Sequence, residues 1–258
     1  MLLYFNEVQE NERPLKAILF DKDGTIFDYS RVWFDVLKTS VDIVFEQYGL
    51  GDKQHTKDLI IRLMGLDEQG HTLSDGVIFS HNKLNIVKNG IRFAVHAHLS
   101  PIKVIQLSNA IVKQNDEHIS QHLLKLDFSK QQQLFKSLKA RGYIIGIVTV
   151  DRKASLDIFL KDMGLEQYID FTTTRDDHLP NKPNTKSFEH FCKKFTLSPN
   201  EVAFVGDTIT DMKYATKAKA GLKIGVGWGG YSIRELEPVA DVTYETLFEI
   251  WNNKTIFN

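Results

Sequence analysis

The stretch AILFDKDGT, residues 17–25, joins four apolar residues directly to a pair of alternating carboxylates. A short apolar run that ends in charge predicts a strand buried on both faces of a parallel sheet. Two similar runs follow: residues 143–148, before Thr149, and residues 202–205, which Asp207 follows after one glycine. Ligands of open α/β sheets bind at the carboxyl ends of the strands. The three polar positions therefore predict a site there.

Helical patterns alternate with strands in the second half of the chain. They cover residues 128–141, 154–163, 187–195 and 212–220. Gly142 directly follows the first pattern and Gly164 the second, at the position where glycine commonly terminates a helix. This alternation predicts an α/β fold with a doubly wound, Rossmann-like, mostly parallel sheet.

The region between residues 29 and 127 has a different pattern, in which helix follows helix without a convincing buried strand. The helical patterns cover residues 32–48, 57–64, 83–97, 103–112 and 116–126. We therefore expect two domains. Residues 1–28 and 128–258 would form the α/β core, and residues 29–127 an inserted all-helical domain.

Composition narrows the possible partners and the compartment. The chain has 32 basic and 33 acidic residues and a net charge of −1, so it offers no electrostatic reason to bind nucleic acid or an anionic membrane. No apolar run reaches the length of a membrane helix, and the first residues lack a signal-peptide pattern. Cys192 is the one cysteine, which fits a reducing compartment. We expect a cytoplasmic protein.

Carboxylates gather around the predicted strand ends. Asp21 and Asp23 flank Lys22, while Asp207 and Asp211 lie four residues apart across a helix start. Hard oxygen ligands without nearby histidine or cysteine favour Mg²⁺. Asp211 by itself is equally well interpreted as a helix-capping residue.

A cluster of carboxylates would repel a phosphate group unless a metal and a cation offset the charge. Lys182, in the loop 179–184, is the best candidate for that cation, and Thr149 can donate a hydroxyl hydrogen bond. Phosphoryl transfer depends mainly on positioning and charge neutralisation, and a carboxylate can serve as its nucleophile.

Four motifs together carry a resemblance to a known family. The string DKDGTIFD at residues 21–28, Thr149, Lys182-Pro183, and the segment 206–208 with Asp211 resemble, in order, the four motifs of the haloacid dehalogenase superfamily. The segments 225–230, 234–236 and 240–241 are similar to the end of its phosphoglycolate phosphatase branch. The resemblance implies that the inserted helical domain is a cap, which closes on the core, excludes water and selects the substrate.

The resemblance also implies a role for each matching residue. Asp21 would be the nucleophile and a metal ligand. Asp23 would be the general acid and base, and its backbone carbonyl would touch the metal. Asp207 would complete the metal site, with Asp211 either a ligand through water or an orienting neighbour.

Phosphate binding is assigned in the same way to three residues. Thr149 and Lys182 would bind the phosphoryl oxygens, and Gly24 would permit the turn that follows Asp23. Superfamily members that cleave carbon–halogen or carbon–phosphorus bonds lack the second carboxylate of the first motif. The presence of Asp23 therefore indicates a phosphate ester, and we expect the partner to be a small phosphorylated metabolite.

Three hypotheses follow. The first is a Mg²⁺-dependent phosphatase that forms an aspartyl-phosphate on Asp21. The second is a phosphomutase of the β-phosphoglucomutase type, which shares all four motifs. The third is a binding protein that keeps the fold without turnover; the full set of motif carboxylates argues against it.

Residues 225–230 match the pattern G-x-G-x-x-G of dinucleotide-binding proteins. The sequence after Gly230 leaves little room for the helix and returning strand that such a site requires. We interpret the segment as a loop near the rim of the site.

Overall fold

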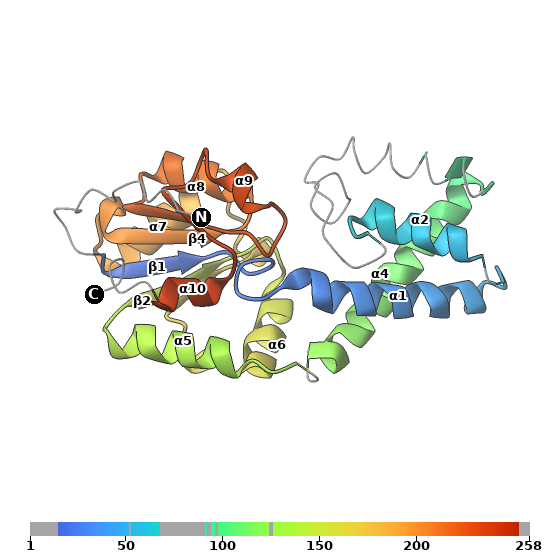
Figure 1. Ribbon diagram of the computed structural model, residues 1–258, viewed down its shortest axis with the longest axis horizontal. Helices are drawn as coiled ribbons and strands as arrows, with labels where there is room; N and C mark the ends of the chain where they lie inside the picture. Colours follow the sequence, from blue (N-terminus) through green and yellow to red (C-terminus); the bar gives the residue numbers. More distant parts are fainter. Residues whose placement is uncertain are drawn as a thin grey trace, which may run out of the picture. The chain divides into compact units, whose positions relative to one another are not determined.

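The computed structural model describes residues 15–51, 53–67, 91, 94–95, 98–123 and 126–252. The chain divides into two compact units (Figure 1). One consists of Met1–Phe27 and Asp127–Asn258, and the other of Asp28–Leu126.

A six-stranded parallel sheet forms the centre of the first unit, in the order β3-β2-β1-β4-β5-β6. Its strands are β1 (Ala17–Phe20), β2 (Ile144–Val148), β3 (Phe171–Thr173), β4 (Val202–Gly206), β5 (Leu222–Val226) and β6 (Val242–Tyr244). In the register, Phe20 at the end of β1 lies opposite Ile147 of β2 and Val205 of β4. The predicted doubly wound α/β fold is confirmed, and β1 lies between β2 and β4, the strands that end directly before Thr149 and Asp207.

Helices cover both faces of this sheet (Figure 1). They are α5 (Ser129–Ala140), α6 (Lys153–Met163), α7 (Lys186–Phe195), α8 (Ile209–Ala218), α9 (Ile233–Leu236) and α10 (Leu247–Asn252). Short 3-10 helices occupy Glu166–Tyr168, Arg175–Asp177 and Pro199–Glu201. Leu19 belongs to the buried cluster shared with α7 and α8, whereas Phe20 packs on Phe135 of α5 with ring centroids 5.1 Å apart. Alternate residues of β1 therefore contact opposite layers, which is why the run is apolar throughout.

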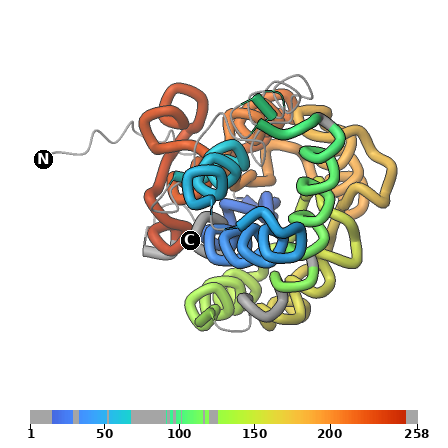
Figure 2. The backbone as a smooth tube through the Cα atoms, turned by 90° about the vertical axis from the view of Figure 1, so that its right-hand side faces the viewer, coloured from blue at the N-terminus to red at the C-terminus, as the bar shows by residue number. Residues whose placement is uncertain are grey.

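The described elements of the second unit are helices: α1 (Tyr29–Gln47), α2 (Gln54–Met64) and α4 (Pro101–Leu123). Helix α1 packs against α4 and, less extensively, against α2 (Figure 2). The unit has its own buried cluster of apolar side chains, which includes Leu37, Phe45 and Leu107.

Some sequence predictions need correction. The patterns 103–112 and 116–126 were predicted as two helices, but α4 is a single helix that covers the first pattern and continues into the second as far as Leu123. The polar residues between the two patterns are compatible with a helix, and Lys113 pairs with Glu117 one turn on. Strands β3, β5 and β6 were not predicted. Gly225 and Val226, predicted as loop, end strand β5. Most of the predicted helix at 83–97 lies outside the described residues.

Among the described helices, none combines the length and the apolar composition that a bilayer span requires.

Cys192 lies in the buried cluster between the sheet and α7, with 7% of its surface exposed. Burial raises the pKa of its thiol to about 11.

Because the thiolate is the reactive form, we expect Cys192 in the folded protein to react with iodoacetamide at pH 8 at least about tenfold more slowly than a free cysteine. The same reaction in urea is the control, and equal rates in the two conditions would contradict the buried assignment.

Candidate active site

The carboxyl ends of three neighbouring strands carry the site. Asp21 follows β1, Thr149 follows β2 and Asp207 follows β4, each directly after the last strand residue. Two of these residues prolong the backbone pairing by one bond: the N–H of Asp21 donates to the carbonyl of Val205 at 2.9 Å, and the N–H of Thr149 to that of Thr173 at 3.0 Å. The sheet therefore fixes the backbone of the site residues.

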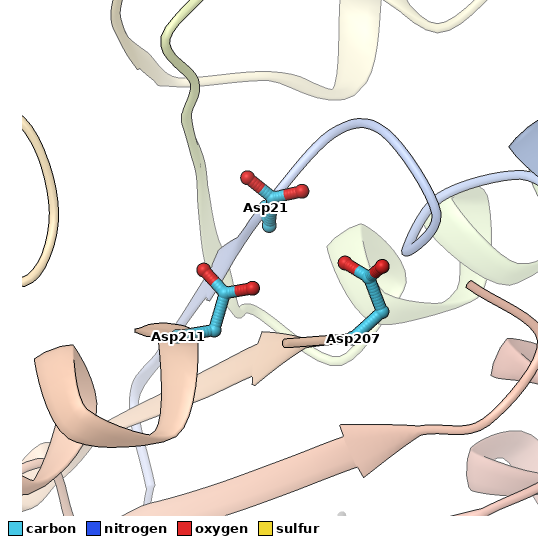
Figure 3. A group of neighbouring side chains, drawn as sticks. All are labelled: Asp21, Asp207 and Asp211. Carbon is cyan, nitrogen blue, oxygen red and sulfur yellow. The ribbon is translucent and has the colours of Figure 1, made fainter. Parts of the chain in front are cut away.

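Three carboxylates meet at these strand ends (Figure 3). One oxygen from each of Asp21, Asp207 and Asp211 lies within 4.8 Å of the others. All the donors are carboxylate oxygens, the ligand type that Mg²⁺ prefers. Histidine, cysteine, aspartate and glutamate are the side chains that commonly bind metals. Among the described residues, these three aspartates form the cluster of such side chains that could hold a metal ion.

Asp207 is held by contacts from two loops. Its Oδ1 accepts a hydrogen bond from Thr25 Oγ1 at 3.0 Å, and its Oδ2 accepts one from the N–H of Gly230 at 2.7 Å. Gly24 has a φ of 76°, and a Cβ there would overlap the Asp207 carboxylate. Glycine is therefore required at position 24 both by conformation and by space.

Asp211, which the sequence left open between a site residue and a helix cap, contacts both the start of α8 and Lys182. Its Oδ2 accepts a hydrogen bond from the N–H of Thr208 at 3.1 Å, which forms a capping box at the start of α8. Its Oδ1 accepts one from Lys182 at 2.6 Å. The residue caps the helix and faces the acidic group at once.

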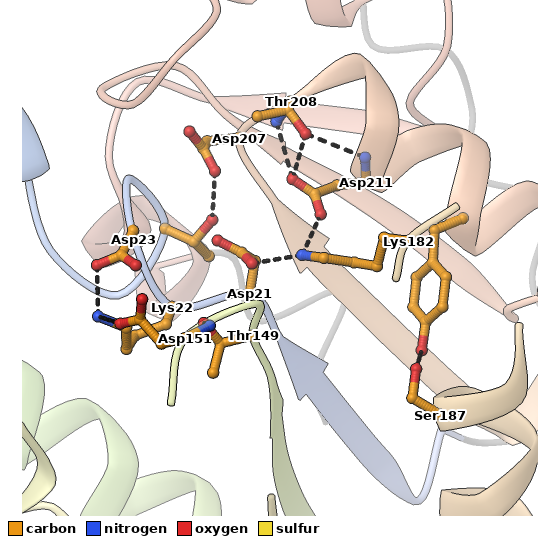
Figure 4. A network of polar contacts seen from close by, with 12 residues as sticks. Asp21, Lys22, Asp23, Thr149, Asp151, Lys182, Ser187, Asp207, Thr208 and Asp211 are labelled. Atoms are coloured by element: carbon orange, nitrogen blue, oxygen red, sulfur yellow. Dashed lines mark hydrogen bonds and ion pairs between the residues drawn. The ribbon is translucent and has the colours of Figure 1, made fainter. Parts of the chain in front are cut away.

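Lys182 lies between two of the carboxylates (Figure 4). Its Nζ pairs with Asp21 and with Asp211, and only 9% of its side chain is exposed. Burial alone would lower the pKa of Lys182, but the two carboxylates raise it above its ordinary value. The side chain therefore remains a cation beside Asp21.

One lysine does not offset the charge of three carboxylates. Burial raises the pKa of Asp21 to about 7, although Lys182 acts in the opposite direction. Burial also raises the pKa of Asp207 well above its usual range, and the neighbouring Asp21 and Asp211 raise it further. A divalent cation would stabilise these carboxylates in their charged form, so the donor set fits a metal in both chemistry and charge.

Asp23 and Thr149 lie near the three carboxylates, and each accepts a hydrogen bond from another residue. The Asp23 carboxylate accepts from Lys22 at 2.6 Å, and Lys22 also pairs with Asp151 at 2.7 Å (Figure 4). The Thr149 Oγ1 accepts from the N–H of Asp151 at 3.1 Å, which leaves its hydroxyl hydrogen to donate elsewhere. These contacts of Lys22 and Asp151 were not predicted from the sequence; for Lys22, its position between the two carboxylates Asp21 and Asp23 was the available signal.

Comparison with known proteins adds independent information. A model of the haloacid dehalogenase-like hydrolase family matches residues 18–224. Pyrophosphatase PpaX of Bacillus pumilus is 23% identical over 84% of this chain and 86% of its own length. A phosphoglycolate phosphatase of Thiobacillus denitrificans is 23% identical over 80% of each chain. A solved structure from Thermotoga maritima, named as a candidate beta-phosphoglucomutase, is 16% identical, with a TM-score of 0.64 over 92% of this chain and 97% of its own.

We predict that Mg²⁺ raises the midpoint of thermal unfolding and that Asp207→Asn abolishes this response. A metal at about a hundred times its dissociation constant adds about 2.7 kcal/mol of stability. Removing one of three buried like charges should leave the metal-free midpoint unchanged or higher. The measurement is thermal unfolding with and without Mg²⁺. Asp157→Asn, which changes an exposed carboxylate of α6, is the control; an undiminished Mg²⁺ response in Asp207→Asn would contradict the site.

Proposed function

The chain belongs to the haloacid dehalogenase-like hydrolase family, and we propose that it is a Mg²⁺-dependent phosphatase that hydrolyses a small phosphate monoester through an aspartyl-phosphate on Asp21. The observation that carries the proposal is the placement of Asp21 beside Lys182, Asp207 at the end of the adjacent strand β4, and Asp211 in the first turn of α8. The relatives named phosphoglycolate phosphatase and pyrophosphatase support phosphoryl transfer as the reaction class.

Asp21 is the proposed nucleophile. An oxygen of its carboxylate attacks phosphorus, and the bond from phosphorus to the ester oxygen breaks. Lys182 and the Thr149 hydroxyl bind the phosphoryl oxygens, with Gly24 shaping the turn beside them. Lys182 contacts the Asp21 carboxylate directly. Its positive charge therefore lies where the negatively charged phosphoryl group must approach this carboxylate.

Asp23 is the proposed general acid and base. In the first step it donates a proton to the leaving ester oxygen, which departs as an alcohol. In the second step the Asp23 carboxylate takes a proton from water, the water oxygen attacks phosphorus, and the bond to Asp21 breaks. Inorganic phosphate leaves, and both carboxyl groups return to their starting states.

Asp21, Asp207 and Asp211, with the backbone carbonyl of Asp23, are the groups that would hold Mg²⁺. When bound, the metal supplies positive charge that neutralises the phosphoryl group and the surrounding carboxylates. We also propose that residues 29–127 form the cap domain that selects the substrate, while residues 1–28 and 128–258 supply the chemistry.

We predict that Asp21→Asn abolishes phosphate release, because the amide is a far weaker nucleophile than a carboxylate, while the fold is retained. The measurement is Mg²⁺-dependent phosphate release from a panel of phosphate esters that includes p-nitrophenyl phosphate, 2-phosphoglycolate and sugar phosphates, with the anhydride pyrophosphate tested beside them. Circular dichroism of the variant is the control for folding. Turnover near the wild-type rate would rule out Asp21 as the nucleophile, and an interconverted sugar phosphate without free phosphate would identify a mutase.

We predict that Asp23→Asn lowers kcat by about 10²-fold or more while changing KM little, since general acid–base catalysis acts on the transition state. Steady-state kinetics on the best ester of the panel measure both constants. A variant that turns over at the wild-type rate would exclude Asp23 as the acid and base.

A further inference from the structure

We propose that Lys22 is a positioning residue for Asp23, anchored by Asp151, and that this Asp23–Lys22–Asp151 bridge sets the efficiency of leaving-group protonation. The inference rests on the proposed phosphatase function. Lys22 touches none of the reacting atoms in this scheme; it would act through the orientation of the Asp23 carboxyl group.

The ammonium group of Lys22 has two carboxylate partners. Its Nζ lies 2.6 Å from Asp23 Oδ1 and 2.7 Å from Asp151 Oδ2, and only 6% of the side chain is exposed (Figure 4). A buried lysine that donates to two carboxylates restricts both of them. Oδ1 of Asp23 is thereby engaged, and Oδ2 is the oxygen left to exchange a proton with a substrate.

Asp151 and the ammonium group of Lys22 both make further contacts. The backbone of Asp151 donates to Thr149 Oγ1 and accepts from the N–H of Arg175 at 2.7 Å. Lys22 Nζ lies 4.7 Å from the centre of the Phe159 ring, and Phe159 is buried in α6. The bridge therefore ties Asp23 to the end of β2 and to α6, so it can hold the carboxyl group in one orientation.

A purely structural role would give different consequences. An ion pair that served only the fold would, when broken, change stability or reduce activity on every substrate alike. A positioning role for the general acid affects the substrate whose leaving group needs the proton most. The two roles can therefore be distinguished by changing the leaving group alone.

Phenyl phosphate and p-nitrophenyl phosphate form the matched substrate pair. They are close in size, but p-nitrophenol is much more acidic than phenol, so its oxygen needs less protonation as it leaves. The ratio of their kcat/KM values reports the first step, because the hydrolysis of phospho-Asp21 is common to both. We expect Lys22→Met to increase the kcat/KM of p-nitrophenyl phosphate relative to that of phenyl phosphate by about tenfold. This change is smaller than the full contribution of general acid catalysis, which is about 10²-fold or more.

Four further variants complete the experiment. Asp151→Asn should shift the ratio in the same direction, and the double variant should shift it no further than the larger single effect, because both act through one bridge. Lys22→Arg, which keeps a cation at this position, should retain a ratio of kcat/KM values close to that of the wild type. Lys139→Met is the matched control: it breaks a half-buried pair with Asp170 elsewhere in the core and should leave the ratio unchanged.

The outcomes separate the inference from the proposed function. An equal loss on both esters in Lys22→Met, or an unchanged ratio with full activity, would overturn the positioning role while the phosphatase stands. If Lys22→Met fails to fold, Asp151→Asn decides the matter by the same ratio. A wild-type protein that releases phosphate from neither aryl ester and from no compound of the wider panel would overturn the proposed function and the inference with it.

Discussion

The site depends on the close approach of three carboxylates around Lys182: Asp207 and Asp211 are buried, and Asp21 is mostly buried. Such a group is unfavourable in a folded protein unless cations and hydrogen bonds offset its charge. The structure supplies part of that compensation. Lys182 bridges two of the carboxylates, and the Gly230 N–H donates to the third. The remaining negative charge makes the group suited to a divalent cation, which would in turn offset the charge of the phosphate ester that we propose as the substrate.

The sheet is what brings these charges together, and that part could be predicted from the sequence. Strands β1, β2 and β4 are buried, so their apolar runs are continuous, and the polar residue after each run marks the strand end. Strands β3 and β6 could not be found in this way. Each has three residues and lies at an edge of the sheet, with at least one residue partly exposed, so neither produces a continuous apolar run.

The contacts that organise the site were harder to anticipate than its members. Residues at the ends of neighbouring strands must lie close together, so Asp21 and Asp207 could be paired from topology alone. The contact between Gly230 and Asp207 depends on the path of a loop, and that between Lys22 and Asp151 joins positions far apart in the chain. A local pattern carries no information on such pairs, because they depend on register and on the direction in which each loop turns.

The position of Lys22 shows why the alternation of side chains along a strand does not predict its contacts. Strand β1 ends at Phe20, and the N–H of Ile26 donates to the carbonyl of Lys22 at 3.0 Å, so the chain is already turning after Asp21. Lys22 can then pair with Asp23, its neighbour in the chain, and with Asp151 beyond β2. Two lysines thus divide the acidic site: Lys182 bridges Asp21 and Asp211 in one half, and Lys22 bridges Asp23 and Asp151 in the other. Because each lysine holds a different carboxylate of the first motif, the proposed nucleophile and the proposed acid can be oriented independently.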